Sequence, residues 1–396
     1  MDDMHKLYLQ YKSVSVYSAV AMAARPLAEL ITAPDPSRRV SCAAEVFRAV
    51  ADSGCDSTGE WVKKLVLADD NPFSRAAARG ERISPKIKTQ VQNELLTFKQ
   101  LSLVKPSEFA GDEATFFPQF GFGGFSITYD GLLQSYANNG CGILSGGDSF
   151  VYRDGNFKAA ATRSEKLSDL KGYIEEKYEI EKNTKSFVDG LPAFHTLLYG
   201  ERGMGKSATV RAVAGEFGGR LKLIEIADIS ELTELVKKIR GLKQKFIIFA
   251  DAVDLDAWQS SRAATDRVLD GAPDNFLVYC TIDRARDSEG RIDRARDNEG
   301  RIDRARDNEG RDALSYSQSE LALFDRFGLV VTYLSPDSDG FVDILKQILR
   351  SRAIKWRDEY GSIAELAARK KGGRSPRAAK QIADLIECTY AQKRCD

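Results

Sequence analysis

Eight residues at 200–207, GERGMGKS, carry the strongest chemical signal in the sequence. They match the pattern G-x-x-x-x-G-K-[ST], in which glycines let backbone N–H groups close around phosphates. Lys206 would reach the β- and γ-phosphates, and the Ser207 hydroxyl would ligate Mg²⁺. The pattern follows the strand-like HTLLY and opens the helical stretch SATVRAVAGEF, so the positive end of a helix adds to the site. The sequence therefore predicts a nucleotide site formed by Gly200, Glu201, Arg202, Gly203, Met204, Gly205, Lys206 and Ser207.

A carboxylate for the metal ion is expected from Asp251, at the end of the strand-like stretch KFIIFAD. Phosphoryl transfer needs such an acid to hold Mg²⁺ from across the sheet. The next position, where P-loop ATPases often carry a glutamate that orients the attacking water, is Ala252. Asp254 and Asp256 follow, and either one reaches the site or both only cap the next helix. We therefore expect Mg²⁺ to bind between Ser207 and Asp251, and we expect hydrolysis to be slow.

These residues need a scaffold, and the second half of the chain predicts one. From about residue 167, helical stretches separate five apolar runs, which are HTLLYG, LKLIEIA, KFIIFAD, NFLVYCTID and GLVVTYLS. The runs are continuous rather than alternating, as in strands that are covered on both faces. This pattern predicts an α/β fold with a parallel sheet flanked by helices. After Pro336 the chain is largely helical, which predicts a small C-terminal helical lid.

The first 165 residues have a different pattern. Apolar residues recur at three- and four-residue intervals up to about residue 110, which predicts a mainly helical region. The stretch TFFPQFGFGGFSITYDG is rich in Phe and Gly, and such residues either stack nucleic-acid bases or form a small sheet packed on its neighbours. SFVYRDGNFKAA predicts a β-hairpin with an Asp-Gly turn. The expected domains are a helical region at 1–110, a small Phe/Gly-rich β element or linker at 111–165, a P-loop domain at 166–335 and a lid at 336–396.

Three charged decamers interrupt the P-loop domain at 283–312, and they read DRARDSEGRI, DRARDNEGRI and DRARDNEGRD. Each has little apolar surface to bury. We interpret them as a solvated loop expanded by duplication. The alternative is a docking arm for a partner.

From about Leu167 to its C-terminus, the chain resembles the AAA+ ATPases. The segment LSDLKGY looks like the one that wraps the adenine in that family, which implies that Gly172 and Tyr173 contact ATP. The stretch NFLVYCTID resembles the sensor-1 strand, whose polar tip touches the γ-phosphate side of the site. Thr281 and Asp283 are both candidates for that tip.

Two further stretches extend the resemblance. FDRFG looks like the motif that carries the arginine finger, and RSPR before a helix is similar to the sensor-2 motif, with Arg374 where the family usually has Gly. Arg326 and Arg377 are therefore candidate catalytic residues. They would act together with Lys206 and Asp251. Because a finger acts in the neighbouring subunit, the resemblance also implies a homo-oligomer.

Four stretches together, GERGMGKS, FIIFAD, FDRFG and RSPRAAKQ, are similar to a bacterial AAA+ family known only as ATP-binding proteins of unknown function. Members tend to have two acids at the end of the second stretch, and Ala252 departs from that pattern. AAA+ machines that thread polypeptides usually carry an aromatic residue in the loop after the second strand. The corresponding loop here, 227–231, has none, which disfavours a protein-unfolding translocase.

The overall composition excludes several classes of protein. Lys plus Arg number 58 and Asp plus Glu number 58, so a global electrostatic grip on nucleic acid or on an anionic membrane is not expected. The six cysteines contain no C-x-x-C pair and there are two histidines, which excludes a zinc site of standard spacing and favours reduced thiols. The apolar run 14–24 is too short to cross a bilayer. We therefore expect a cytoplasmic protein without membrane association.

Three functions remain open. The first is an Mg²⁺-dependent AAA+ ATPase that binds ATP and remodels or regulates an unidentified macromolecular partner. The second is an ATP-sensing switch with little hydrolysis. The third is a nucleic-acid-associated loader, because basic residues cluster in the lid, although a solvated helical face gives the same composition. The basic residues of the lid are Arg350, Arg352, Lys355, Arg357, Arg369, Lys370, Lys371, Arg374, Arg377 and Lys380.

Overall fold

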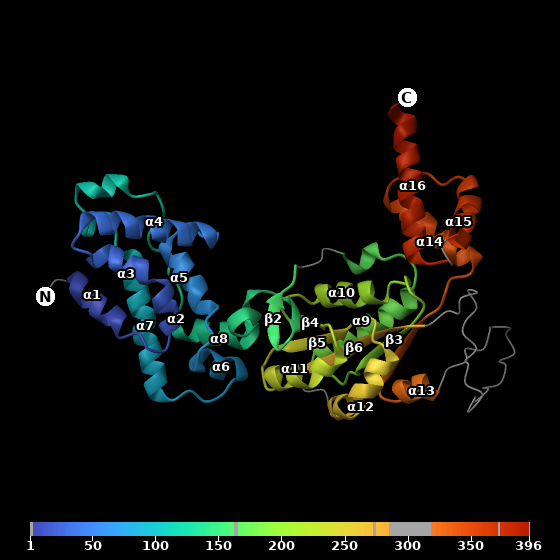
Figure 1. The fold of residues 1–396 in the computed structure, drawn as a ribbon, viewed down its shortest axis with the longest axis horizontal. Helices are drawn as coiled ribbons and strands as arrows, with labels where there is room; N and C mark the ends of the chain where they lie inside the picture. Colours follow the sequence, from blue (N-terminus) through green and yellow to red (C-terminus); the bar gives the residue numbers. More distant parts are fainter. Residues whose placement is uncertain (1–2, 162–164, 272–274, 285–317, 371–372, 396) are drawn as a thin grey trace. The chain divides into compact units, whose positions relative to one another are not determined.

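The chain forms two compact units in a computed structural model that describes residues 3–161, 165–271, 275–284, 318–370 and 373–395 (Figure 1). Unit 1 consists of Met1–Gly147 with Gly241–Gln244, and unit 2 consists of Asp148–Arg240 with Lys245–Asp396. The charged decamers at 283–312, which we interpret as a solvated loop, lie outside the described residues, apart from Asp283 and Arg284. No helix in the described part of the chain combines the length and the apolar run that a membrane span needs.

Unit 1 is helical, as its apolar spacing predicts. Its core contains Val46, Trp61, Phe98 and Tyr136, each at most 4% exposed. Prolines occupy the first turns of four of its helices, where a missing N–H costs no hydrogen bond. The helices are α1 (Asp3–Lys12), α2 (Ser18–Ala23), α3 (Arg25–Thr32), α4 (Pro36–Asp52), α5 (Thr58–Leu67), α6 (Pro72–Arg79), α7 (Pro85–Leu103) and α8 (Tyr129–Asn139).

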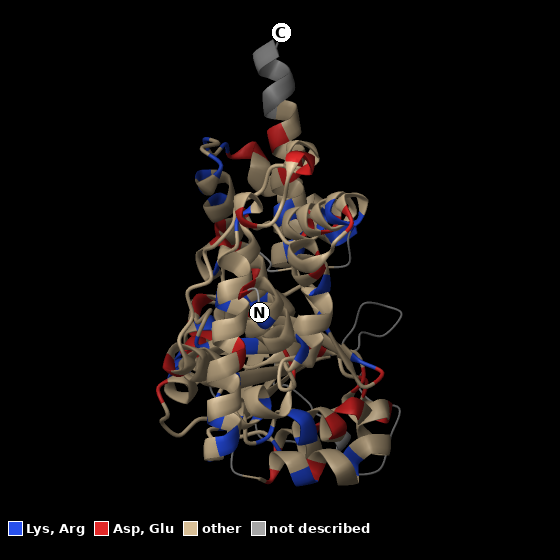
Figure 2. Ribbon diagram, turned by 90° about the vertical axis from the view of Figure 1, so that its left-hand side faces the viewer, with Lys and Arg blue, Asp and Glu red and all other residues tan. Residues whose placement is uncertain are grey.

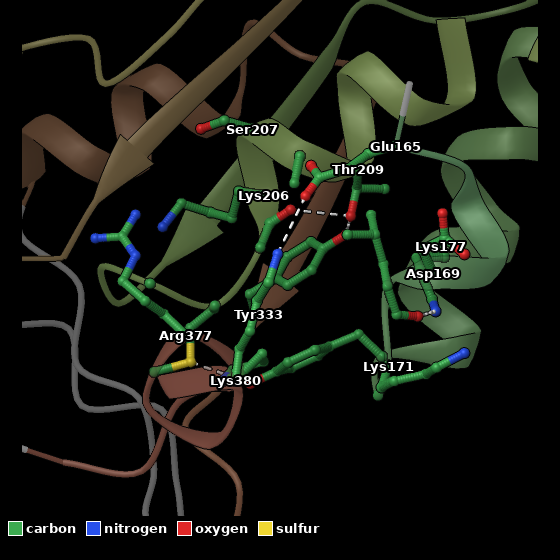
Figure 3. A pocket seen from close by; sticks show the side chains of 18 of the residues that line it. Glu165, Asp169, Lys171, Lys177, Lys206, Ser207, Thr209, Tyr333, Arg377 and Lys380 are labelled. Carbon is green, nitrogen blue, oxygen red and sulfur yellow. Dashed lines mark hydrogen bonds and ion pairs between the residues drawn. The ribbon is translucent and has the colours of Figure 1, made fainter. Parts of the chain in front are cut away.

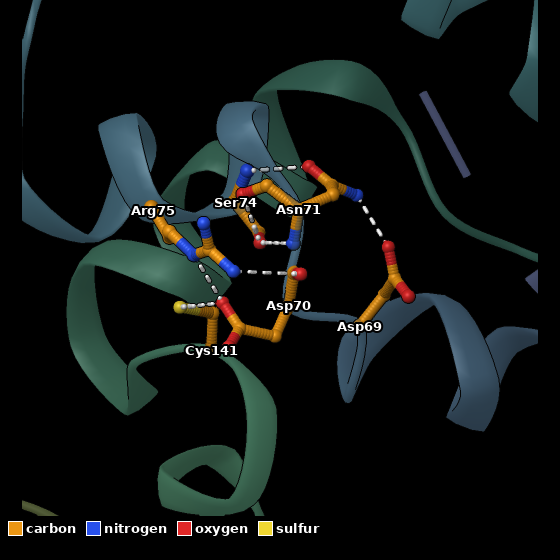
Figure 4. A network of polar contacts seen from close by, with 6 residues as sticks. All are labelled: Asp69, Asp70, Asn71, Ser74, Arg75 and Cys141. Carbon is orange, nitrogen blue, oxygen red and sulfur yellow. Dashed lines mark hydrogen bonds and ion pairs between the residues drawn. The ribbon is translucent and has the colours of Figure 1, made fainter. Parts of the chain in front are cut away.

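A polar network closes the start of α6 (Figure 4). The Asn71 side chain accepts a hydrogen bond from the Ser74 N–H, and the Ser74 hydroxyl accepts one from the Asn71 N–H, both at 2.9 Å. This reciprocal pairing satisfies two backbone donors that the helix leaves open. Asp70 accepts a hydrogen bond from Arg75 at 2.7 Å and lies 3.8 Å from the Cys141 thiol. Every group in this network has a structural partner.

The Phe/Gly-rich stretch of unit 1 differs from the small sheet that its composition suggests. After a 3₁₀ turn at Asp112–Phe116, the chain is irregular up to α8, with positive φ at Gly123 and Gly124, and makes one isolated bridge, between Ser57 and Gly121. The Gly59 N–H donates to the Gly123 carbonyl at 2.8 Å, and a Cβ on Gly59 would lie 2.0 Å from that oxygen. The glycines therefore let the backbone pack directly on the start of α5, an approach that side chains would prevent in an ordinary sheet.

Unit 2 contains a seven-stranded sheet in the order β2-β1-β4-β5-β6-β3-β7. All pairs are parallel except the β1–β2 hairpin. The predicted parallel sheet is thus confirmed, with a strand in each of the five apolar runs. The strands are β1 (Ser149–Arg153), β2 (Asn156–Ala159), β3 (Thr196–Gly200), β4 (Leu221–Ile226), β5 (Lys245–Ala250), β6 (Phe276–Asp283) and β7 (Leu329–Tyr333).

The hairpin predicted from SFVYRDGNFKAA forms the edge of this sheet. Its turn residues Asp154 and Gly155 both have positive φ, +51° and +78°, which is the backbone conformation that a two-residue hairpin turn requires. Strand β1 pairs with β4, with Ser149 opposite Leu223. Because of this pairing, the two units divide between residues 147 and 148 rather than at 165–166.

Helices cover both faces of the sheet, which explains the continuous apolar runs. Helices α9 (Ile174–Val188) and α10 (Lys206–Glu216) lie on one face, and α11 (Leu232–Ile239) and α12 (Leu255–Leu269) lie on the other (Figure 1). All five residues of β3 are buried. After the short α13 (Gln318–Phe324) and β7, the lid consists of α14 (Ser338–Ser351), α15 (Glu359–Lys370) and α16 (Pro376–Cys395), which pack around their own apolar core.

The burial of His195, the residue before β3, should make the stability of the fold depend on pH. The ring is 5% exposed, its Nδ1 accepts the Val278 N–H at 2.9 Å, and its Nε2 has no partner among the described residues. Burial lowers the pKa of His195 to about 4, from 6.5. Above pH 6.5 the ring is neutral in both folded and unfolded states. Below that pH only the unfolded state binds the proton, so stability should fall until the folded ring titrates.

We expect this loss to reach about 1.4 kcal/mol per pH unit between pH 6.5 and about 4. Urea unfolding of unit 2 at several pH values measures it. His195→Asn keeps an acceptor for the Val278 N–H and should show a shallower pH dependence, whereas His5→Asn, at an exposed site in α1, should match the wild type. Equal slopes for His195→Asn and wild type would contradict the assignment.

Candidate nucleotide-binding site

A cavity of about 930 Å³ in unit 2 contains most of the residues predicted to bind a nucleotide (Figure 3). It lies where β3, β5 and β6 end, beside the first turns of α10 and α16. Gly200, Glu201, Thr281 and Arg326 are not among its lining residues. The predicted residues that line it are Gly172, Tyr173, Arg202, Gly203, Met204, Gly205, Lys206, Ser207, Asp251, Asp283 and Arg377.

The loop between β3 and α10 depends on its glycines. A Cβ on Gly200 would lie 2.1 Å from the Tyr333 carbonyl oxygen of the neighbouring strand β7, so this position admits no side chain. Gly205 precedes α10 with φ of +97°, a left-handed conformation that glycine adopts without strain. The backbone therefore curls tightly around the space in front of the helix. Free N–H groups at a helix start favour an anion there.

Lys206 is the buried cation of this loop and is 4% exposed. Its ammonium donates to the carbonyls of Gly200 and Glu201 and to the Asp283 carboxylate, all at 2.8 Å. Burial lowers the pKa of Lys206, and the ion pair with Asp283 opposes that shift. The charge is thus held at the cavity by three acceptors, and phosphate oxygens would be stronger partners than the two neutral carbonyls.

The Asp251 carboxylate meets Ser207 and Thr281. Its Oδ1 accepts hydrogen bonds from the Ser207 hydroxyl at 2.5 Å and from the Thr281 hydroxyl at 2.7 Å. Strands β5 and β6 bring Asp251 and Thr281 together, because the residues before them, Ala250 and Cys280, lie opposite each other in the sheet. Burial alone would raise the pKa of Asp251, but the hydrogen bonds from Ser207 and Thr281 and the Arg211 charge outweigh it and lower the pKa.

The Ser207–Asp251 pair fits Mg²⁺. A hydroxyl and a carboxylate within 2.5 Å of each other supply the hard oxygen ligands that this ion prefers. The pair faces the same cavity as Lys206. Ser207 and Asp251 would therefore hold the ion next to bound phosphates, where it would neutralise their charge.

Arg211 is a site residue that the sequence reasoning missed. It lies one helical turn after Ser207, so it is on the same face of α10. Its guanidinium contacts Asp251 Oδ2 at 3.0 Å and makes two hydrogen bonds of 2.8 Å to Glu225 of β4. The four-residue spacing from Ser207 was the available signal. Arg211 orients the carboxylate whose other oxygen faces Ser207.

Gly172 and Tyr173 form an apolar wall of the cavity. Tyr173 has φ of +52°, its ring lies 4.9 Å from that of Tyr333, and its hydroxyl donates to the Leu334 carbonyl at 2.5 Å. A Cβ on Gly172 would lie 2.9 Å from the Ile344 side chain of the lid. Aromatic and aliphatic groups in this position suit a flat base, and the contact of Gly172 and Tyr173 with ATP stays a prediction.

The lid contributes Arg377. Its backbone N–H lies 3.4 Å from the Gly203 carbonyl, and its side chain extends toward that of Lys206 (Figure 3). Burial is the main cause of the lowered pKa of Lys206, and the positive charge of Arg377 lowers it further. Arg374 instead forms an ion pair with Glu365 at 2.9 Å and does not line the cavity. Two cations at one end of the cavity favour a polyanionic ligand.

Arg326 lies outside this cavity. Its guanidinium contacts Asp266 of α12 at 3.2 Å and Asp270, the residue that follows this helix, at 3.4 Å, and the side chain is 31% exposed. The described structure therefore places Arg326 on the surface of its own chain. Its role as a finger stays a prediction.

The structure shows whether the acids after Asp251, namely Asp254 and Asp256, reach the cavity or cap the next helix. The Asp254 carboxylate accepts the Asp256 N–H at 3.2 Å and caps α12. Neither acid lines the cavity, whereas Ala252 does. Capping is thus confirmed for Asp254. Ala252 has φ of +51° and donates its N–H to the Thr281 hydroxyl at 2.7 Å, so the missing carboxylate is not supplied by the next few residues.

Several basic residues of the lid are paired with acids. Arg352 contacts Asp384 at 2.7 Å and Glu387 at 2.8 Å, and Lys380 contacts Glu165 at 3.4 Å. Figure 2 shows acidic and basic residues interspersed along the helices near the C-terminus. Such pairing reduces the positive charge that a phosphate backbone would meet. Nucleic-acid binding by the lid stays a prediction.

Comparisons with known proteins match the chain to a family that has no assigned activity. The family described as "Protein of unknown function (DUF815)" matches residues 148–390, starting at the first residue of unit 2. No curated protein sequence matches the chain. The chain is similar in structure to the RuvB Holliday junction branch migration motor of Thermotoga maritima, with 14% identity, 59% of this chain and 67% of that chain covered, and a TM-score of 0.38.

Two other solved structures are also similar. For C. elegans PCH-2 the identity is 14%, the coverage is 56% of this chain and 64% of that chain, and the TM-score is 0.35. For the FIGL-1 AAA domain in complex with ADP the identity is 15%, the coverage is 52% and 68%, and the TM-score is 0.32.

Proposed function

The chain belongs to the DUF815 family of proteins of unknown function, and we propose that this member is an AAA+ ATPase that binds ATP with Mg²⁺ and hydrolyses it slowly. One observation carries the proposal. Lys206, Ser207 and Asp251 meet at a single cavity, with Lys206 buried and Ser207 hydrogen-bonded to Asp251. These are the groups that phosphoryl transfer needs for the phosphates and for the metal ion.

The rest of the cavity supports a nucleoside triphosphate as the ligand. Lys206 and Arg377 provide two positive charges for the phosphates. Tyr173 and Tyr333, whose rings lie 4.9 Å apart, provide a surface for a base. A ligand that carries both a flat base and a polyphosphate uses both ends of this cavity.

Slow hydrolysis follows from Ala252. A methyl group cannot accept a proton from water or orient it, so the position after Asp251 contributes nothing to that step. The same observation favours a second candidate function, in which the chain is an ATP-sensing switch with little turnover. The difference between the two is measurable as phosphate release.

We further propose that the protein acts as a homo-oligomer on a macromolecular partner. Arg326 does not line the cavity of its own chain and is partly exposed, which suits a group that completes the site of a neighbour. Such contacts would be head-to-tail.

Mg²⁺-dependent phosphate release from ATP is the expected activity. Chelation with EDTA should abolish it, and Asp251→Asn should lower it by on the order of 100-fold while ATP still binds, because Lys206 and the loop hold the phosphates. The measurements are phosphate release and equilibrium binding of a fluorescent ATP analogue, each with and without Mg²⁺. Asp256→Asn, outside the cavity, is the matched control. Release that persists in EDTA would contradict the metal site, and binding without release would favour the switch.

A further inference from the structure

Asp283 contributes a carboxylate to the lining of the cavity. It is the last residue of β6, and it lies opposite Gly200 where β3 enters the phosphate-binding loop. Strand β6 lies between β3 and β5, so its tip is between the loop and Asp251. The Asp283 Oδ1 atom is 2.8 Å from the Lys206 ammonium, and the side chain is 40% exposed.

The other acids of the cavity have different partners. Among the described residues, four acids line it, namely Glu165, Asp169, Asp251 and Asp283. Both oxygens of Asp251 accept hydrogen bonds, from Ser207 and Thr281 on one side and from Arg211 on the other. Glu165 pairs with Lys380, and Asp169 accepts the Lys166 N–H at 3.1 Å. Asp283 is thus the described acid that contacts the phosphate-binding lysine, and its Oδ2 has no hydrogen bond to any described residue.

We propose that Asp283 is a catalytic residue that accepts the proton of the attacking water, in place of the acid that is missing at Ala252. This inference rests on the proposed ATPase function. The water oxygen forms a bond to the γ-phosphorus, and the bond from that phosphorus to the β–γ bridging oxygen breaks. ADP leaves with the bridging oxygen, and the water proton passes to Asp283 and then to solvent.

The geometry suits this role because Lys206 and Asp283 are already in contact. When γ-phosphate oxygens take Lys206 as their partner, Oδ1 loses its hydrogen bond and remains within the reach of one water molecule from the phosphate. A general base must lie within hydrogen-bond reach of the proton it takes, directly or through one water. The carboxylate that such enzymes usually place after the metal-binding Asp would then be supplied one strand nearer to the loop.

Asp283→Asn tests the proposal because it keeps the shape and removes the base. We expect ATP turnover to fall by at least about 100-fold, the lower end for a general base. The dissociation constant for a fluorescent ATP analogue should stay within about threefold of wild type or become tighter, since a negative charge near the phosphates is removed. The double variant Asp283→Asn with Ala252→Glu should regain turnover. Asp283→Glu should keep at least about tenfold more activity than Asp283→Asn.

Asp254→Asn is the matched control, because asparagine caps a helix as well as aspartate does and Asp254 does not line the cavity. Its turnover should equal that of wild type. Unchanged turnover in Asp283→Asn would overturn the role of Asp283 and leave the ATPase proposal standing. Tighter ATP binding with unchanged turnover would mean that Asp283 only competes with phosphate. An absence of turnover in the wild-type protein that binds ATP would overturn both hydrolysis and the role of Asp283.

Discussion

Replacing Lys206 with alanine should weaken ATP binding by at least about 100-fold, which corresponds to about 2.7 kcal/mol. The expected effect is large because the ammonium is buried, and the loss of a desolvated charge from a charge pair costs about 2–5 kcal/mol. The protein should still fold, because the acid left behind, Asp283, is 40% exposed and can be hydrated. Titration with a fluorescent ATP analogue measures the binding, and thermal unfolding reports the fold.

Lys245→Ala is the matched control for this variant. Lys245 begins β5 at the end of the strand opposite to Asp251, and its ammonium donates to the Phe187 carbonyl outside the cavity. Its removal should leave the dissociation constant for ATP unchanged. Lys206→Arg should bind more weakly than wild type, since a planar guanidinium does not replace a point charge in a tight loop. An unchanged dissociation constant for folded Lys206→Ala would reject the nucleotide site.

Arg326→Ala should lose turnover by on the order of 1,000-fold, the effect of removing an arginine finger, while ATP still binds. The reason is that each chain holds its own Lys206 and Asp251, whereas Arg326 contacts the carboxylates of Asp266 and Asp270 and does not line the cavity of its chain. Specific activity of the wild type should also rise with protein concentration, because the complete site needs a neighbour.

A mixture of two inactive variants tests whether Arg326 acts in the site of a neighbouring chain. The Arg326→Ala chain retains Lys206, and the Lys206→Ala chain retains Arg326, so mixed oligomers should contain some complete sites and recover activity. Arg262→Ala is the control, because Arg262 contacts the same Asp266 carboxylate at 3.6 Å without belonging to the motif. If co-assembled variants recover no activity, Arg326 acts within its own chain or is structural.

The central sheet could be predicted from the sequence because burial on both faces leaves a continuous apolar run. The strands β3 to β7 each fall within such a run. The position of the hairpin could not be predicted in this way. Strand β1 joins β4 through a parallel pairing of residues more than 70 positions apart, with Phe150 opposite Ile224. A local pattern contains no information about such a distant partner.

The local geometry of the candidate site could be predicted where a motif fixes it and could not be predicted where the tertiary structure does. The spacing in GERGMGKS places Lys206 and Ser207 at the start of one helix, as observed. Arg211 contributes through Glu225 on a different strand, and no sequence motif links those two residues. The Phe/Gly-rich stretch was misleading for a related reason, since Gly59, far from it in sequence, determines how closely its backbone packs.

The β1–β2 hairpin has a consequence for the solubility of the protein. Without it, β4, with the sequence LKLIEI and five of six residues buried, would end the sheet and expose a row of unpaired backbone groups beside apolar side chains. Such an edge pairs readily with another chain and promotes aggregation. The hairpin replaces it with β2, which has four residues, three of them exposed, and includes Lys158. A short, charged final strand is a poor template for intermolecular β-sheet, so the hairpin protects the sheet from polymerising along its edge.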